Sequence, residues 1–254
     1  GVTETNNEGT LVFNDVTFTY PDGEEPVIKN VSFKAKKGET IAFIGSTGSG
    51  KSTLINLIPR FYDVTGGSIK IDGIDVRDFK IKSLRQKIGF IRQKTLLFTG
   101  SIKSNIKFGK QEASHDEVVE SAKTAQAYDF ISKKELKFDE PIGEGGSNVS
   151  GGQKQRLSIA RALVRKPEIY IFDDSFSALD FKTDAILRAE LKKETADAIV
   201  LIVAQRIGSI MEADKIIVLD EGKVVGCGKH KELLKSCSVY KEIALSQLTE
   251  EELA

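Results

Sequence analysis

The segment from Gly45 to Thr53, with the sequence GSTGSGKST, constrains this chain more than any other. It fits the P-loop pattern G-x-x-x-x-G-K-[ST]. The apolar run at residues 40–44 predicts a buried strand entering the loop, and residues 53–58 predict the helix leaving it. Glycines let backbone N–H groups converge on phosphate oxygens, and the helix N-terminus adds positive charge. The predicted phosphate-contacting residues are Ser46, Thr47, Gly48, Ser49, Gly50, Lys51, Ser52 and Thr53, with the Ser52 hydroxyl as a ligand of Mg²⁺.

A second segment has the same chemistry at a helix start. Ser150, Gly151, Gly152 and Gln153 precede an amphipathic helical pattern at residues 154–163. Serine and two glycines at a helix start make another terminus that receives anions. One chain has little use for two such sites on one nucleotide, unless the second serves a nucleotide held by another subunit. An ordinary turn and helix cap is the alternative interpretation.

With these two motifs in place, the chain resembles the nucleotide-binding domain of ABC transporters, of the exporter type, over nearly its whole length. Residues 150–153 match the family's signature motif, with Val149 in place of the usual leucine. The other matching positions are Tyr20 (adenine stacking), Gln93 (Q-loop), Asp173 (Walker B) and Asp180 (D-loop). The phrases at residues 60–63, 71–77 and 97–106, and Glu144-Gly145 before the signature, are similar to exporters rather than importers.

The resemblance implies roles for these positions, each with a plainer alternative. Asp173 is expected to bind Mg²⁺ from the end of its strand, although such an aspartate can merely cap a turn. Gln93 is expected to reach Mg²⁺ or the attacking water, or else to be an ordinary surface glutamine. Tyr20, beside the turn Pro21-Asp22-Gly23, is expected to stack on adenine, whereas most aromatic residues belong to a core.

Two positions depart from the family's pattern in the catalytic apparatus. Asp174 stands where a competent site has a glutamate, and its side chain is one methylene shorter. Gln205 stands where the family has a histidine, and an amide can donate a hydrogen bond but cannot carry a proton. We therefore count Asp174, Gln205 and Gln93 as the catalytic positions of a site that binds ATP well and hydrolyses it slowly.

Periodicity predicts the fold class. Short alternating runs before residue 75 predict an antiparallel sheet, and residues 94–163 are mostly helical in pattern. After residue 163, apolar strands alternate with helices. This part ends in a predicted hairpin at residues 215–225 and a helical tail from about residue 231. We predict an α/β fold: a P-loop NTPase parallel-sheet core, an antiparallel β subdomain, and a helical subdomain at about residues 94–163 that carries the signature motif. Residues 1–10 are interpreted as a linker and residues 11–254 as the nucleotide-binding domain.

Composition narrows the possible partners. Lys+Arg and Asp+Glu both number 37, so no net basic field directs the chain toward nucleic acid. Cys227 and Cys237 fit neither a metal pattern nor a disulfide framework, which suits a reducing cytosol. No apolar run approaches the ~20 residues that cross a bilayer. If the resemblance holds, a transmembrane domain of the same polypeptide precedes Gly1, and this domain lies at the cytoplasmic face of the cell membrane.

The resemblance implies an ATPase of an exporter that moves a small molecule or lipid, powered by ATP-driven dimerisation, with ATP and Mg²⁺ as cofactors. The expected partner is a second nucleotide-binding domain, a different chain with the glutamate and histidine, whose site the signature motif of this chain completes. The alternatives are an ABC-type ATPase without a transport role and an ATP-gated regulatory module. Chromosome-maintenance relatives insert long coiled coils between the two motifs, whereas residues 51 and 150 lie about a hundred residues apart here.

Overall fold

The computed structural model describes residues 1–254, and its centre is a six-stranded sheet in the order β12-β11-β3-β10-β9-β6. All neighbouring strands are parallel except β12, which pairs antiparallel with β11 at one edge. The strands span Thr40–Ile44 (β3), Ile88–Ile91 (β6), Ile169–Asp173 (β9), Ile199–Val203 (β10), Lys215–Asp220 (β11) and Lys223–Gly228 (β12). Their apolar runs are buried on both faces, as in parallel sheets covered on each side. The predicted parallel core and edge hairpin are confirmed.

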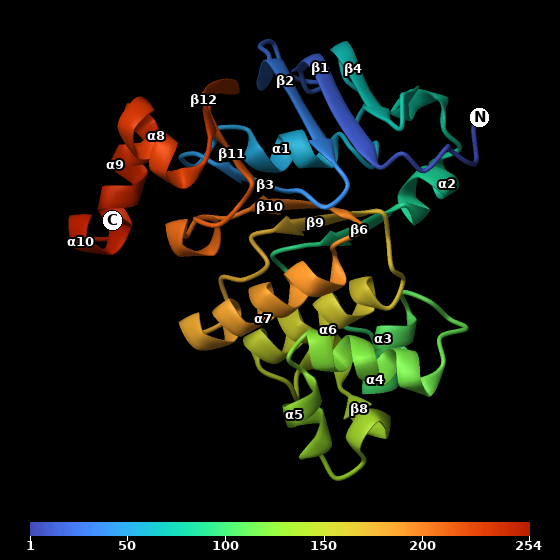
Figure 1. The fold of residues 1–254 in the computed structure, drawn as a ribbon. Coiled ribbons are helices and arrows are strands. Elements are labelled where there is room, and N and C mark those ends of the chain that lie inside the picture. The colour runs from blue at the N-terminus through green and yellow to red at the C-terminus, as the bar shows by residue number, and fades with distance from the viewer.

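A second sheet of four strands, in the order β2-β1-β4-β5, is antiparallel and lies above the first in Figure 1. Its strands span Thr10–Phe18 (β1), Ile28–Lys36 (β2), Gly66–Ile71 (β4) and Ile74–Asp75 (β5). Helix α1 (Lys51–Asn56) buries Leu54 and Ile55 in one apolar cluster with side chains of both sheets. In this cluster the ring of Phe33 lies 5.4 Å from that of Phe43. Helix α1 is therefore held between the two sheets.

The lower part of the molecule in Figure 1 is helical. It contains α3 (Ile102–Lys107), α4 (His115–Thr124), α5 (Tyr128–Ser132), α6 (Gly151–Leu163) and α7 (Phe181–Glu194), with a small sheet of β7 (Gly100–Ser101) and β8 (Pro141–Ile142). Ser114 begins α4 with a capping box, because its hydroxyl accepts from the Glu117 amide at 3.1 Å and Glu117 accepts from the Ser114 amide at 3.2 Å. The helical character predicted for residues 94–163 is thus observed.

The remaining elements lie at the edges. They are α2 (Ile81–Gln86), α8 (His230–Ser236), α9 (Ser238–Gln247), α10 (Glu250–Leu253) and the 3₁₀ turns η1 (Val76–Asp78), η2 (Lys137–Asp139), η3 (Glu144–Gly146) and η4 (Ile207–Ser209). The Val2 amide donates to Asp78 O at 2.7 Å, so the N-terminal residues lie against η1; the linker interpretation of residues 1–10 stays a prediction. Lengths and hydropathies of the helices leave none that would span a bilayer.

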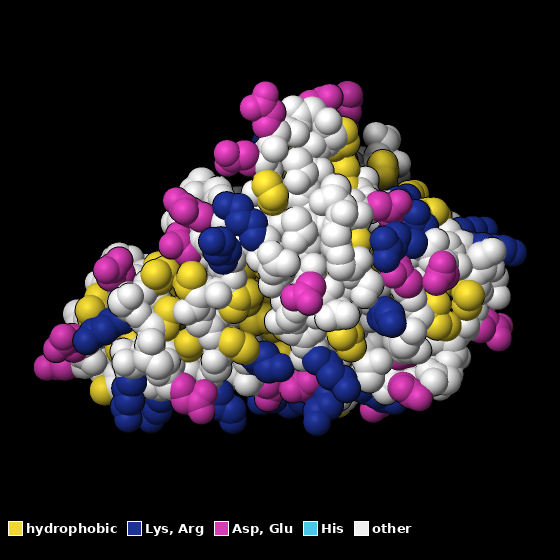
Figure 2. All heavy atoms as spheres, turned by 90° about the horizontal axis from the view of Figure 1, so that it is seen from above, with side chains coloured by type: hydrophobic (Ala, Val, Ile, Leu, Met, Phe, Trp, Pro, Cys, Tyr) yellow, Lys and Arg dark blue, Asp and Glu magenta, His cyan; other side chains and the backbone are white.

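The surface seen in Figure 2 mixes charges of both signs. Lys and Arg side chains alternate with Asp and Glu over this face, and neither sign forms one continuous area. This distribution agrees with the equal totals of 37 basic and 37 acidic residues.

Candidate active site

The loop between β3 and α1 has a shape that depends on glycine. Gly48 and Gly50 have φ angles of 81° and 104°, in the left-handed region that favours glycine. A Cβ atom on Gly45 would collide with the carbonyl oxygen of Leu219. The buried Ser49 accepts a hydrogen bond at its carbonyl from the amide of Gly222 at 2.9 Å. The loop is therefore fixed by β11 and by the turn that follows it.

A cavity of about 420 Å³ opens over this loop. It is lined by residues 45–53 and by Gln93, Asp173, Asp174 and Gln205, together with Val27, Val203, Ile243 and Gln247. The strands β3, β9 and β10 all end at it, which is where α/β sheets bind their ligands. Segments more than a hundred residues apart in the sequence thus bring most of the predicted site residues to one place.

Lys51 holds its ammonium at the loop. Its Nζ donates to the carbonyl oxygens of Gly45 at 2.5 Å and Ser46 at 3.0 Å. Burial lowers the pKa of Lys51, and the charges of Asp174 and Asp173 oppose that shift. A partly desolvated cation beside two carboxylates, at a helix N-terminus, suits contact with phosphate oxygens and a metal ion.

Ser52 and Asp173 meet at the floor of the cavity, where the Ser52 hydroxyl donates to Asp173 Oδ1 at 3.4 Å. No group of three or more His, Cys, Asp or Glu side chains in the chain could hold a metal ion. Mg²⁺ is ordinarily held by one or two protein oxygens together with substrate phosphates and water, rather than by an all-protein cage. The residues present therefore fit Mg²⁺, and the three predicted metal-binding residues, Ser52, Gln93 and Asp173, all line this cavity.

Asp173 and Asp174 form a pair of partly buried carboxylates at the end of β9. Burial raises the pKa of Asp173, and burial followed by repulsion from Asp173 raises the pKa of Asp174. Asp174 has a φ of 50°, a left-handed conformation that Asp adopts more readily than most non-glycine residues. The negative charges of both carboxylates thus destabilise the ligand-free protein, and a bound cation would offset this cost.

Replacing Asp173 by asparagine is expected to stabilise the nucleotide-free chain at pH 7. The folded pKa of Asp173 lies above its ordinary value of 3.8, so the fold binds this proton more tightly than the unfolded chain does. The stability due to this group is therefore present below pH 3.8 and is lost as pH rises through the folded pKa. Urea unfolding in EDTA should show a higher midpoint for the variant at pH 7, with the difference shrinking toward pH 4.

Asp63 provides a control of opposite sign. Its hydrogen bond from Arg60 lowers its pKa, so Asp63→Asn should lose stability at pH 7. An Asp173→Asn variant that unfolded more easily than the parent chain at pH 7 would contradict the assignment of Asp173 as a destabilising carboxylate.

The backbone of Gln93 is held by a hydrogen bond from helix α6. Gln155 of α6, which is 3% exposed, donates from Nε2 to the Gln93 carbonyl at 2.8 Å and accepts at Oε1 from the Thr95 hydroxyl at 2.8 Å. The backbone of the loop is therefore fixed while the Gln93 side chain lines the cavity. Gln155 was not among the predicted site residues, because its contact crosses 62 positions of the sequence.

Tyr20 lies beside the cavity rather than in its lining. Its hydroxyl shares a hydrogen bond of 2.7 Å with the Thr53 hydroxyl at the start of α1. Its ring is half-buried and meets Tyr62 edge-on at 5.2 Å. Tyr20 therefore borders the P-loop with part of its ring exposed, and its predicted stacking on adenine stays a prediction.

The signature residues lie outside this cavity. Ser150 caps α6: its hydroxyl accepts from the Gln153 amide at 3.1 Å, and Gln153 Oε1 accepts from the Ser150 amide at 3.0 Å. Asp180 caps α7 by accepting from the amide and hydroxyl of Thr183, both at 2.8 Å, and these bonds lower the pKa of Asp180. The structure thus brings together the P-loop, Gln93, Asp173, Asp174 and Gln205, and separates them from residues 150–153 and 180.

Two residues of helix α9, Ile243 and Gln247, line the cavity and were not predicted. Their segment carries only a weak helical pattern in the sequence, with no recognised motif.

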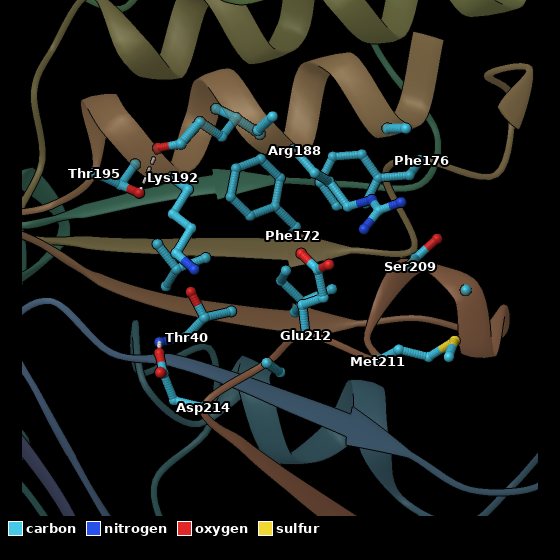
Figure 3. A pocket seen from close by; sticks show the side chains of 17 residues that line it. Thr40, Phe172, Phe176, Arg188, Lys192, Thr195, Ser209, Met211, Glu212 and Asp214 are labelled. Carbon is cyan, nitrogen blue, oxygen red and sulfur yellow. Dashed lines mark hydrogen bonds between the residues drawn. The ribbon is translucent and has the colours of Figure 1, made fainter. Parts of the chain in front are cut away.

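A second cavity of about 380 Å³ lies between α7 and the segment after β10 (Figure 3). Phe172 and Phe176, near the two aspartates in the sequence, line it, and none of the predicted site residues does.

Comparisons with known proteins agree with this geometry. The family model described as "ABC transporter" matches residues 28–177, more than half of the chain. A Staphylococcus aureus protein named "Putative multidrug export ATP-binding/permease protein" is 46% identical over 236 residues, covering 93% of this chain and 41% of that protein. An "Uncharacterized ABC transporter ATP-binding protein" of Mycobacterium bovis is 45% identical over 242 residues, covering 94% of this chain and 41% of that protein.

Among solved structures, that of "a bacterial Atm1-family ABC exporter with ATP bound" superposes with a TM-score of 0.92 at 35% identity, covering 96% of this chain and 43% of that chain. This chain therefore spans less than half the length of the relatives it matches. Sequence, fold and site geometry agree with one another, and the resemblance drawn from the motifs is confirmed: the chain belongs to the ABC transporter family.

Proposed function

We propose that this chain is the ATP-binding domain of an ABC exporter and that it works as one half of a head-to-tail pair. The main support for this proposal is that the P-loop cavity and the signature residues 150–153 lie apart in the chain's own structure. The P-loop cavity contains Lys51, Asp173 and Asp174 but none of the signature residues. The first two amides of α6, those of Gly151 and Gly152, are left unpaired by the helix itself. These amides are suited to the phosphates of a nucleotide held by a second subunit.

The cavity has the groups to bind MgATP and lacks a side chain that reaches far enough to activate water. Lys51 and the loop amides receive the phosphates, and Ser52 and Asp173 hold the metal, which neutralises phosphate charge when bound. Asp174 occupies the position of the general base, but its carboxylate falls short by about 1.5 Å, the length of one C–C bond. Gln205 donates a hydrogen bond without carrying charge. We therefore propose slow hydrolysis at this site.

The partner is proposed to be a different chain that carries the glutamate and the histidine. Residues 150–153 of this chain would complete the partner's site, where hydrolysis is fast. The length of the relatives and their permease names support a transmembrane domain in the same polypeptide. This domain would then lie at the cytoplasmic face of the membrane and power export of a small molecule or lipid.

A nucleotide-trapping experiment tests this proposal. The full transporter is purified with its partner, turned over with a photoreactive ATP analogue and crosslinked, and the nucleotide on each chain is identified. We expect the triphosphate on this chain and mainly the diphosphate on the partner. A non-hydrolysable analogue serves as the control and should label both chains equally. Equal turnover at both sites, or a fully active homodimer of this chain, would exclude the proposed asymmetry.

A further inference from the structure

The loop that carries Gln205 is held by the last residue of helix α9. Gln247 donates from Nε2 to the carbonyl oxygen of Gln205 at 2.5 Å and accepts at Oε1 from the amide of Ile207 at 2.8 Å. Both polar atoms of one amide side chain are thus used on the backbone two residues apart. Gln247 also lines the cavity, as does Gln205.

The same loop is anchored on its other side. Arg206 donates to the carbonyl oxygens of Phe176 at 2.5 Å and Leu179 at 3.1 Å. Further along, the Ser209 hydroxyl donates to Asp184 of α7 at 3.0 Å, and Asp184 is 2% exposed. Figure 3 shows Ser209 on the segment facing α7 and Phe176 on the strand-to-helix connection beside it. These bonds hold residues 206 and 209, and they leave the backbone carbonyl of Gln205 to Gln247.

The Gln205 side chain itself has no hydrogen-bond partner within the protein. Gln205 is exposed and lines the cavity, so its backbone sets the point from which the side chain enters the cavity. In turn, α9 is fixed to α8, because Tyr240 of α9 shares a hydrogen bond of 2.6 Å with the buried His230 of α8. Contacts therefore connect helices α8 and α9, through Gln247, to the backbone of Gln205, whose side chain lines the cavity.

We propose that Gln247 is a positioning residue, which sets the location of the Gln205 amide and so contributes to the discrimination of ATP from ADP. This inference rests on the proposed function, because it takes Gln205 to donate to the terminal phosphate. It assigns to the C-terminal helix a part in nucleotide recognition.

The test compares binding of MgATP and MgADP to the chain carrying Gln247→Met. Methionine keeps the length and packing of the side chain and removes both hydrogen bonds. Loss of such bonds at an exposed site is expected to weaken MgATP binding two- to tenfold and to leave MgADP binding unchanged. Ser246→Ala, in the same exposed turn of α9 and outside the cavity, is the matched control and should change neither affinity.

A double-variant cycle separates positioning from direct contact. Gln247→Met should have no further effect on a Gln205→Ala background, since Gln205 is then no longer there to be positioned. Equal losses for MgATP and MgADP, or the same loss on that background, would overturn the inference. If Gln247→Met leaves the ratio unchanged while Gln205→Ala alters it, the inference alone is overturned. If Gln205→Ala itself leaves the ratio unchanged, the role of Gln205 in the proposed function is wrong and the inference is overturned with it.

Discussion

Replacing Asp174 by glutamate together with Gln205 by histidine is expected to raise ATP hydrolysis at this chain's own site about 10²- to 10⁴-fold. The additional methylene moves the carboxylate outward by about 1.5 Å, toward the position of the attacking water. Burial, followed by repulsion from Asp173, raises the pKa of the Asp174 carboxyl, and a glutamate at this position would lie beside the same Asp173. A raised pKa favours general-base catalysis, because the best base titrates near the working pH.

Backbone strain at residue 174 does not offset this gain. Residue 174 has a φ of 50°, a left-handed conformation that Asp adopts more often than Glu does. Holding a non-glycine residue there costs about 1–3 kcal/mol of folding stability. This strain is present in the ground state and in the transition state alike, so it does not reduce the expected rate gain of 10²- to 10⁴-fold, which corresponds to about 2.7–5.4 kcal/mol of barrier.

The measurement is single-site turnover in the assembled transporter, with labelled ATP trapped on this chain. Asp174→Asn with Gln205→His is the control, because an amide at residue 174 cannot accept the proton and no acceleration is expected. An unchanged rate in the Glu and His variant, with ATP still bound, would show that the shortened carboxylate does not limit hydrolysis.

Lys51→Met is expected to weaken ATP binding to this chain by roughly 10- to 150-fold, the range for losing hydrogen bonds to a charged group. The Lys51 ammonium lies on the carbonyl oxygens of the loop, where it would meet the phosphates. Equilibrium titration with MgATP measures the loss. Lys36→Met, at an exposed position of β2 outside the cavity, should leave the affinity unchanged.

In the absence of nucleotide, the Lys51→Met chain is expected to be at least as stable to unfolding as the parent chain. Burial lowers the pKa of Lys51, so the folded state disfavours its charged form, and a neutral methionine removes that cost. Urea unfolding therefore distinguishes a lost phosphate contact from a damaged fold. An unchanged ATP affinity in a folded Lys51→Met chain would contradict the placement of phosphates over this loop.

Much of the fold follows from local pattern. The apolar run of β3, the glycines of the loop and the start of α1 are contiguous, so their geometry depends on neighbouring residues and was predictable. The Ser114 capping box and the hairpin of β11 and β12 were predictable for the same reason. The convergence of Asp173 and Ser52 could be predicted because both follow the carboxyl ends of parallel strands.

The contacts that position the site could not be predicted from the sequence. Gln155 reaches Gln93 across 62 residues, and Gln247 reaches Gln205 across 42. A glutamine within a helix has no sequence feature that marks such a contact, because its partner is a backbone atom, which every type of residue has. Only the packing of α6 and α9 against the sheet brings these amides to their loops.

The anchoring of the P-loop on β11 and on the turn that follows it has a thermodynamic consequence. Gly45 has no room for a side chain against Leu219, and Ser49 is bonded to Gly222, so the phosphate cradle loses its conformational entropy when the protein folds. A nucleotide that enters then meets a preorganised receptor and bears little of the ordering cost itself. Part of the free energy that favours binding is therefore provided when the six-stranded sheet folds, before a ligand binds.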